Sequence, residues 1–421
     1  MTQTDTLTVV VKADCPTCVI AAPALRTLAD AGVEIVSQDD PAFPGGIDRV
    51  VDDTTLERSA ELAIEVVPTL VRFTNGIESS RVEGWDRARW TAVSGIAGLG
   101  ADLPERRPGC GSLTLDPRRA DELLVRQRAG TLASRRVTLS ALEDDVDAFD
   151  ARGWGDGLPV VPPTEARVLR MLEGTDRAPD EVVAVVPPDL TPATVEKVAI
   201  NAVLAGCRPE YLPVVLAAVE AACTEEFNMH GLLATTWFAG PMVVVSGPVA
   251  RDIGMNDAMN ALGQGNRANA TIGRALQLIV RNVGGGRPGG VDRATLGNPG
   301  KYTFCFAETP PADSDWPNQA VELGEDPAGS AVTLVAAEGV RGIIDQLSRT
   351  PESLARSFAE VLAGVAHPKL AIAFDASLVI SPEHLRVFRE AGWTKGRLRQ
   401  ELATLLTLDG ALLARGARGI A

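Results

Sequence analysis

Two cysteines three residues apart, Cys15 and Cys18, have the clearest capacity for chemistry in this sequence. They follow a β-branched run, 7–12, which predicts a strand, and precede 19–31, whose apolar spacing predicts a helix that stops at Gly32. Thiolate is the reactive form of cysteine, and the free N–H groups at a helix N-terminus stabilise a negative sulfur. The pattern therefore predicts a redox-active dithiol in which Cys15 attacks and Cys18 closes the disulfide or releases a mixed-disulfide partner.

A zinc site is the alternative interpretation of Cys15 and Cys18. Such a site needs two further ligands, and neither a second CxxC nor a nearby histidine supplies them. Asp14 precedes the pair, and its negative charge is expected to oppose thiolate formation at Cys15. We therefore expect a redox-active disulfide, Cys15–Cys18, and no metal.

The elements that must position these cysteines come in a definite order. The expected elements are a strand at 33–37, a helix at 56–65, a strand at 66–73, a turn at Asn75-Gly76, a strand at 77–82 and a helix at 87–96 capped by Asp86. With the Cys15-x-x-Cys18 pair and the triplet Val67-Pro68-Thr69, this order resembles the thioredoxin fold. The resemblance implies that Pro68 lies in a cis-proline loop facing the cysteines, where the backbone offers partners to an incoming chain.

Any of the four other cysteines could be the thiol that the Cys15–Cys18 dithiol reduces. Cys305 lies on an expected strand at 302–307, whose alternation would put Lys301 and Thr303 on the same face. Cys207 is followed by Arg208, which could lower its pKa.

The remaining two cysteines differ in their surroundings. Cys110 is flanked by glycines in an expected linker, so it is either a thiol that shuttles between domains or simply an exposed cysteine. Cys223 lies on an apolar helix and is expected in the core.

Composition bounds the architecture and the partners. The chain has 421 residues, 45% of them hydrophobic, and a formal net charge of −15. These values indicate a globular protein with more than one domain, and the acidity makes nucleic acid and anionic membrane poor partners. We predict an α/β protein: a thioredoxin-like domain at 1–100, a Pro/Gly linker and helical connector at 101–150, and a larger α/β domain with a mixed sheet at 151–421. Neither a membrane span nor a secretory signal is visible, which predicts a cytoplasmic location.

Asparagines and cations of the second domain suggest an anion site. Asn266, Arg267 and Asn269 open an expected helix and would point donors at an anion. Arg287 and Lys301 lie in or near a Gly-rich loop that could form an anion-binding nest. Helix capping and turn chemistry are the alternative role of these residues.

A histidine offers a different chemistry. His230 precedes a glycine and could be a general base, with Asp156 or Asp292 orienting it. A single histidine is, however, more often structural. Asp156 is also a candidate substrate-binding residue.

Residues 154–406 resemble a second family. The segments that carry this resemblance are 154–164 (WGDGLPVVPPT), 196–215, 266–276 and 297–305 (GNPGKYTFC). The family is a little-characterised bacterial one, loosely associated with small proteins that bear a selenocysteine- or cysteine-Gly-Ser-Cys motif. The association implies thiol or selenol redox chemistry. The present chain has Cys110-Gly111-Ser112-Leu113 and thus lacks the second cysteine of that motif.

Three functional hypotheses follow from the sequence. The first is an oxidoreductase in which the N-terminal dithiol reduces a catalytic cysteine of the second domain, acting on a small, anionic substrate and regenerated by an external thiol reductant. The second is a non-redox lyase or hydrolase centred on His230, with the first domain as a docking module. The third is a thiol-switched binding protein. A homodimer is compatible with each of them.

Overall fold

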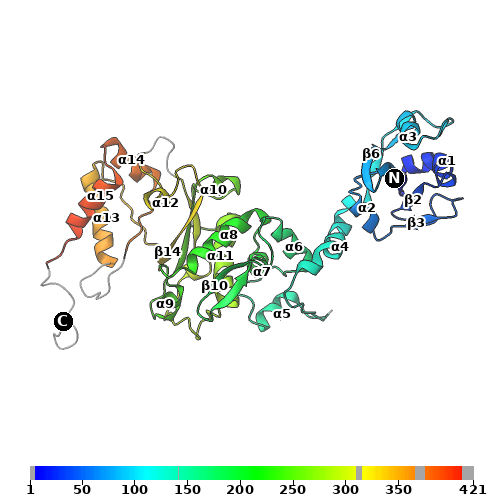
Figure 1. The fold of residues 1–421 in the computed structure, drawn as a ribbon. Coiled ribbons are helices and arrows are strands. Elements are labelled where there is room, and N and C mark those ends of the chain that lie inside the picture. Colours follow the sequence, from blue (N-terminus) through cyan, green and yellow to red (C-terminus); the bar gives the residue numbers. More distant parts are fainter. Residues whose placement is uncertain (1–4, 141, 310–314, 366–374, 410–421) are drawn as a thin grey trace. The chain divides into compact units, whose positions relative to one another are not determined.

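The computed structural model describes residues 5–140, 142–309, 315–365 and 375–409. The chain divides into two compact units, one of 1–136 with 163–173 and one of 137–162 with 174–421. Helices and mixed sheets make up the structure, so the predicted α/β class is confirmed. Figure 1 traces the elements in chain order.

One mixed sheet organises the first unit, and its strand order is β3-β2-β1-β5-β6. β1 runs parallel to β2, and β2 parallel to β3, whereas β5 is antiparallel to both β1 and β6. The strands are β1 (Asp5–Val11), β2 (Glu34–Ser37), β3 (Val50–Asp52), β5 (Thr69–Thr74) and β6 (Ile77–Glu83). Val9, Ile35 and Leu70 are fully buried, and these β-branched and leucine side chains form the centre of its core.

Side-chain caps mark the start of four of the five α-helices described in the first unit. They are α1 (Pro16–Asp30), α2 (Glu57–Glu61), α3 (Arg87–Ser94), α4 (Pro117–Arg128) and α6 (Glu165–Leu172), with short 3-10 turns η1 (Leu113–Leu115) and η2 (Ala129–Thr131). Cys15 is the N-cap of α1, and Pro16 occupies its first turn, where a missing N–H costs nothing. α1 therefore starts three residues before the predicted 19, and Cys18 lies inside it. Asp86 caps α3, as predicted, by accepting from the Arg89 N–H.

The segment predicted as a linker is instead bound to the first unit by two short ladders. Here β4 (Val66–Val67) pairs antiparallel with β9 (Cys110–Gly111), and β7 (Trp85–Asp86) pairs antiparallel with β8 (Arg106–Arg107). The first unit extends to Arg136, beyond the expected boundary at residue 100.

A second mixed sheet, of order β13-β12-β14, organises the second unit. β12 (Gly240–Ser246) is buried along its whole length, parallel to β13 (Cys305–Glu308) and antiparallel to β14 (Ala331–Ala337). The prediction of a strand at 302–307 is wrong at its start, because β13 begins only at Cys305. Lys301, just before the predicted strand, belongs to a 3-10 turn, η4 (Pro299–Lys301). Lys301 and Thr303 therefore do not share a strand face with Cys305.

Helices and a small hairpin complete the second unit. The hairpin pairs β10 (Val182–Val186) with β11 (Thr191–Thr194). The helices are α5 (Asp145–Ala151), α7 (Val195–Ala205), α8 (Leu212–Ala222), α9 (Met229–Ala234), α10 (Pro248–Asp252), α11 (Arg267–Asn282), α12 (Gln319–Glu322), α13 (Pro351–Val365), α14 (Pro382–Glu390) and α15 (Lys395–Leu406), with η3 (Pro209–Tyr211) before α8. A strand expected at 370–375 falls outside the described residues apart from its last position.

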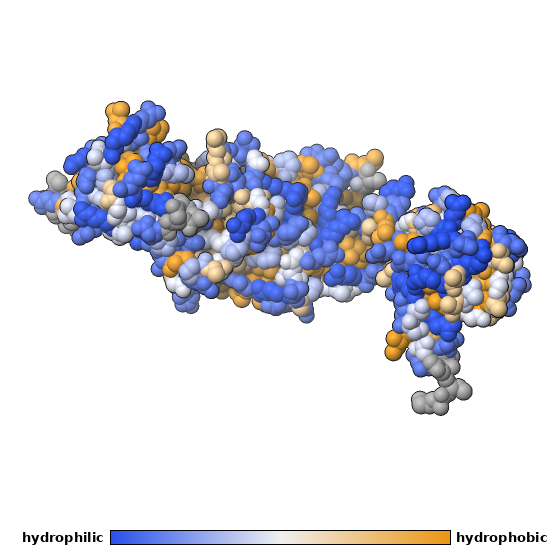
Figure 2. All heavy atoms as spheres, turned by 90° about the horizontal axis from the view of Figure 1, so that it is seen from above, coloured by the Kyte–Doolittle hydropathy of each residue, from blue (hydrophilic) through white to orange (hydrophobic). Residues whose placement is uncertain are grey.

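The surface drawn in Figure 2 is mostly hydrophilic. Hydrophobic residues lie among the hydrophilic ones in small groups. Among the helices of the described residues, none is long and apolar enough to cross a bilayer.

The β4–β9 ladder depends on a glycine, which gives a first prediction. A Cβ added at Gly109 would overlap Val66 Cγ1 and lie 2.8 Å from the Val67 carbonyl oxygen, whereas one at Gly111 meets nothing within 4 Å. Overpacking of this kind costs about 1–3 kcal/mol. We expect Gly109→Ala to speed amide exchange of the Ser112 N–H, which donates to the Glu65 carbonyl at 2.9 Å, by at least about fivefold.

The measurement is hydrogen–deuterium exchange of peptides that cover Ser112, and Gly111→Ala is the matched control. Equal exchange in the two variants would show that the ladder does not depend on the space at Gly109.

Candidate functional site

Cys15 lies at the centre of a thiol cluster in the first unit. Its backbone is extended at φ −143° and ψ 112°, and its Sγ accepts the Cys18 N–H at 3.3 Å. The Val67 carbonyl oxygen lies 3.5 Å from the same sulfur. Cys15 is 1% exposed and Cys18 is fully buried. The strand-to-helix junction thus holds Cys15 where the first free N–H groups of α1 converge.

A third cysteine, Cys110, completes the cluster. Its Sγ lies 2.9 Å from Cys15 Sγ, and both residues are free thiols. A covalent S–S bond is about 2.05 Å long, so the two sulfurs are in contact but unbonded. Cys110 is half-buried. Sequence reasoning placed Cys110 in a linker, and its position beside Cys15 was missed.

Hydrogen bonds on both sides hold Cys110 in place. Cys110 is the register partner of Val67 in the β4–β9 ladder. The Thr17 hydroxyl donates to the Pro108 carbonyl at 2.6 Å, and Lys12 Nζ donates to the Gly111 carbonyl at 2.9 Å. A residue within the Cys15–Cys18 motif and a residue before it thus bind carbonyls on either side of Cys110.

A buried glutamine fixes the far end of the same segment. Gln38 is fully buried, and its Nε2 donates to Ser112 Oγ at 2.7 Å. Its Oε1 accepts the Leu113 N–H at 3.1 Å. A buried amide with both ends bonded strongly prefers one position of this segment, because leaving either group unpaired is costly.

The protonation states of the three thiols differ. Hydrogen bonding from the Cys18 side chain, opposed by burial and aided by Cys110 and the Cys18 and Thr17 N–H groups, lowers the pKa of Cys15 to about 5. Burial, with the nearby Cys15 sulfur, raises the pKa of Cys18 well above its usual range. Burial and the Cys15 sulfur also raise the pKa of Cys110. At neutral pH Cys15 is therefore a thiolate that accepts from two thiols.

The sequence led to predictions about two neighbours of Cys15, namely Asp14 and Pro68. Asp14 was expected to oppose the thiolate, yet the pKa of Cys15 is lowered, because the hydrogen bonds at the sulfur dominate. The Asp14 N–H instead donates to Asp39 Oδ2 at 2.9 Å, which holds the loop before α1. The Val67–Pro68 peptide bond is cis, and the Pro68 carbonyl accepts the Gly84 N–H at 2.8 Å.

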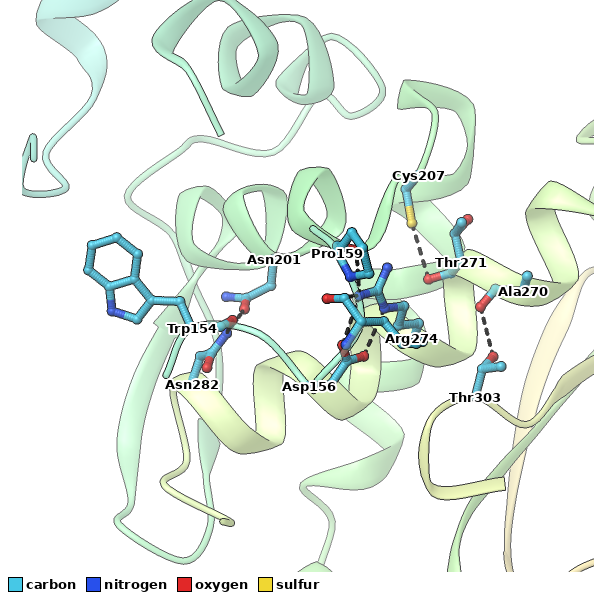
Figure 3. Close-up of polar contacts among 11 residues, drawn as sticks. Trp154, Asp156, Pro159, Asn201, Cys207, Ala270, Thr271, Arg274, Asn282 and Thr303 are labelled. Carbon is cyan, nitrogen blue, oxygen red and sulfur yellow. Dashed lines mark hydrogen bonds and ion pairs between the residues drawn. The ribbon is translucent and has the colours of Figure 1, made fainter. Parts of the chain in front are cut away.

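Cys207 and Cys305 of the second unit are both buried, and burial keeps their thiols protonated. Each is 6% exposed. Burial raises the pKa of Cys207 to about 12, and its Sγ donates to the Thr271 carbonyl at 3.4 Å (Figure 3). Burial also raises the pKa of Cys305. Arg208 was expected to activate Cys207, but burial outweighs the charges near that thiol. Burial also raises the pKa of Cys223, to about 11.

The candidate anion-binding residues of the second unit are held by other groups. Asp156 forms a two-point ion pair with Arg274, both contacts at 2.8 Å, and the Pro159 carbonyl accepts from the same guanidinium (Figure 3). Burial raises the pKa of Asp156, but Arg274 more than offsets it, so the net pKa lies below its usual range. Lys301 Nζ contacts Asp292 Oδ1 at 2.8 Å, with both side chains largely buried.

The asparagines at the start of α11 have capping and loop-holding roles. Asn266 Oδ1 caps the helix by accepting the Asn269 N–H at 3.0 Å. Asn269 Nδ2 donates to the Asn256 and Ala261 carbonyls at 2.9 and 3.1 Å. Arg267 Nε donates to the Gly206 carbonyl at 2.8 Å. These contacts favour the alternative that the sequence left open, capping and turn chemistry.

The general-base interpretation of His230 receives no support from its surroundings. His230 is exposed on α9, and the two carboxylates expected to orient it, Asp156 and Asp292, pair with Arg274 and Lys301 instead. Arg287 is also exposed, and its backbone forms a tight turn within the Gly-rich loop.

A contact between two side-chain amides, one buried and one half-buried, was not foreseen from the sequence. Asn282 Nδ2 donates to Asn201 Oδ1 and to the Trp154 carbonyl, each at 2.9 Å (Figure 3). The pair ties α7 and α11 to the segment that opens the second unit. Two single asparagines in separate helices carry no periodic signal that would have predicted it.

Two further findings concern cofactors and relatives. Within the ranges that the structure describes, no group of three His, Cys, Asp or Glu side chains could hold a metal ion. Comparison of the chain with family models, with curated proteins and with solved structures found no match.

The thiol cluster generates a second prediction. Thiolate absorbance of the wild-type protein at low ionic strength should rise with a midpoint near pH 5 for one cysteine, because the other thiols of the cluster have raised pKa values. Cys18→Ala removes the strongest hydrogen bond to the Cys15 sulfur, so its midpoint should shift upward. Cys223→Ser is the control and should leave the midpoint unchanged. A single transition near the ordinary cysteine pKa of about 8.5 in wild type would contradict the assignment.

The Asp156–Arg274 pair generates a third prediction. Asp156→Asn leaves a largely buried guanidinium unpaired, which costs about 3 kcal/mol. Because the folded pKa of Asp156 lies below its unfolded value of about 3.9, the stabilisation is complete above that pH and is lost as pH falls further.

We expect calorimetry at pH 7 to show a lowered Tm for the second unit in Asp156→Asn. The control is Glu181→Gln, which removes an exposed partner of Arg177 and should change stability by about 0–1 kcal/mol. Equal shifts in the two variants would argue against a structural role for Asp156.

Proposed function

We propose that the protein is a thiol–disulfide oxidoreductase whose nucleophile is Cys15 and whose resolving thiol is Cys18. The observation that carries this proposal is the N-cap position of Cys15, where its sulfur accepts the Cys18 N–H at 3.3 Å and its pKa is lowered to about 5. A thiolate formed at neutral pH beside a protonated thiol is the arrangement that disulfide exchange requires.

The sheet order β3-β2-β1-β5-β6, the CxxC at the start of α1 and the cis Val67–Pro68 bond support the proposal that the first unit is thioredoxin-like. The lowered pKa of Cys15 and the raised pKa of Cys18 also divide the two roles. Of these two cysteines, only Cys15 is a thiolate at neutral pH, so Cys15 makes the first attack.

The reaction balances as two successive exchanges. The Cys15 thiolate attacks a disulfide, forming a mixed disulfide and releasing one substrate thiolate, which takes a proton. Cys18 then loses its proton and attacks the Cys15 sulfur. The Cys15–Cys18 bond forms, the second substrate thiolate leaves, and two electrons have passed from the dithiol to the substrate. An external thiol reductant restores the dithiol, and we place this activity in the cytoplasm, where such reductants are abundant.

The relay toward the second unit rests on weaker support. Cys207 and Cys305 are buried and have raised pKa values, so neither is an activated thiol in this conformation. If the dithiol of the first unit re-reduces Cys207 or Cys305 after each turnover, the helices around that cysteine must first move apart to expose it. The lyase hypothesis has less support, because the carboxylates expected beside His230 are paired with cations.

A fourth prediction tests the nucleophile. At about pH 6 ordinary cysteines are less than one per cent ionised, whereas Cys15 remains a thiolate. Single-turnover reduction of 5,5′-dithiobis(2-nitrobenzoate) at that pH should lose at least about tenfold in rate with Cys15→Ser. Cys207→Ser, Cys305→Ser and the control Cys223→Ser should react as wild type does. A wild-type rate in Cys15→Ser would refute the proposed function.

A further inference from the structure

The two thiols beside the Cys15 sulfur, those of Cys18 and Cys110, come from different parts of the chain. The Cys18 N–H belongs to the same helix, whereas Cys110 is brought in from 95 positions away by the β4–β9 ladder. Its sulfur is 2.9 Å from Cys15 Sγ, a contact distance at which exchange requires only a small displacement.

The site of contact is a sheet edge that an incoming chain could otherwise use. β4 ends at Val67, directly before Pro68, and β9 adds to it as an antiparallel strand. Extended peptides bind exposed strand edges in this way, through main-chain hydrogen bonds. Here residues 110–111 of the same chain occupy that edge. They lie where the strand of an external partner would otherwise bind, next to the dithiol.

Specific contacts maintain this arrangement. Thr17 and Lys12 bind the carbonyls of Pro108 and Gly111, and Gly109 approaches Val66 and Val67 too closely for any side chain. A glycine-flanked cysteine in a free linker would need none of these features. Cys110 is also half-buried, whereas Cys15 and Cys18 are buried, so it is the most exposed thiol of the three.

We propose that Cys110 is a third redox-active residue of this centre and forms a disulfide with Cys15. This inference rests on the proposed function, since it requires that Cys15 undergoes exchange. Once a low-molecular-weight disulfide has oxidised the Cys15–Cys18 pair, Cys110 loses its proton and attacks the Cys15 sulfur. The Cys15–Cys110 bond forms and the Cys15–Cys18 bond breaks. The electron pair stays on the Cys18 sulfur, which takes up a proton, so the step needs no further oxidant.

The test maps disulfides in the full chain. Wild type and Cys18→Ser are equilibrated with a mixture of reduced and oxidised glutathione, quenched with acid and alkylated, and then digested with trypsin without reduction. Cleavage after Lys12, Arg26, Arg106 and Arg118 puts Cys15 in peptide 13–26 and Cys110 in peptide 107–118. In Cys18→Ser a link between these peptides can only join Cys15 to Cys110. In wild type, peptide 13–26 also carries Cys18, so fragment ions of the cross-linked species assign the bonded cysteine.

We expect the cross-linked species to account for most of the oxidised Cys15 in Cys18→Ser, and to be detectable in wild type. Gly109→Ala, which displaces β9, should lower its yield several-fold, whereas the matched control Gly111→Ala should not. Cys18→Ala serves as a second background, since a buried serine could impair folding, and the wild-type measurement requires no substitution at all.

The other outcomes separate this inference from the proposed function. Cys15 linked only to glutathione, with Cys110 alkylated, would overturn the role of Cys110 and leave Cys15 as the nucleophile. Cys15 alkylated in all samples, even at a large excess of oxidised glutathione, would overturn both.

Discussion

The thiol cluster of the first unit is organised around the Cys15 sulfur at the N-terminus of α1. The Cys18 N–H and the side-chain thiols of Cys18 and Cys110 all lie beside this sulfur. Burial by itself would raise the pKa of Cys15, and its lowered pKa is the net result of donors that outweigh desolvation. Two of these donors, the thiols of Cys18 and Cys110, are the groups that the proposed reactions would join to Cys15.

Positioning Cys110 requires that a two-residue strand stay paired. So short a ladder contributes little by itself, and the contacts of Thr17, Lys12 and Gln38 on either side of it supply the remaining order. Two of these contacts, those of Thr17 and Lys12, come from residues within or just before the segment that carries the Cys15–Cys18 pair. The binding of the segment and the chemistry of the dithiol are thereby coupled through the start of α1.

In the second unit, the polar residues that could bind an anion are used to hold the fold together. Asp156 pairs with Arg274, Lys301 with Asp292, and Asn201 with Asn282. The first and third pairs join segments that are distant in the chain, whereas Lys301 and Asp292 are nine positions apart. Buried polar groups of this kind are costly to leave unpaired. Most of the asparagines and cations that suggested an anion site are therefore engaged in helix caps, loop contacts and ion pairs in this conformation.

The sequence by itself determined the local features of this protein. The period of the β-branched runs, the helical stripe after Cys18, the cap at Asp86 and the turn at Asn75-Gly76 are each specified by a few neighbouring residues, and the α/β class follows from their order. Tertiary structure alone decided the partner of Cys15 and the burial of Cys207 and Cys305. The physical reason is that β9 is too short to show a period, and its pairing with β4 depends on the space beside Gly109 and on hydrogen bonds between residues far apart in the chain.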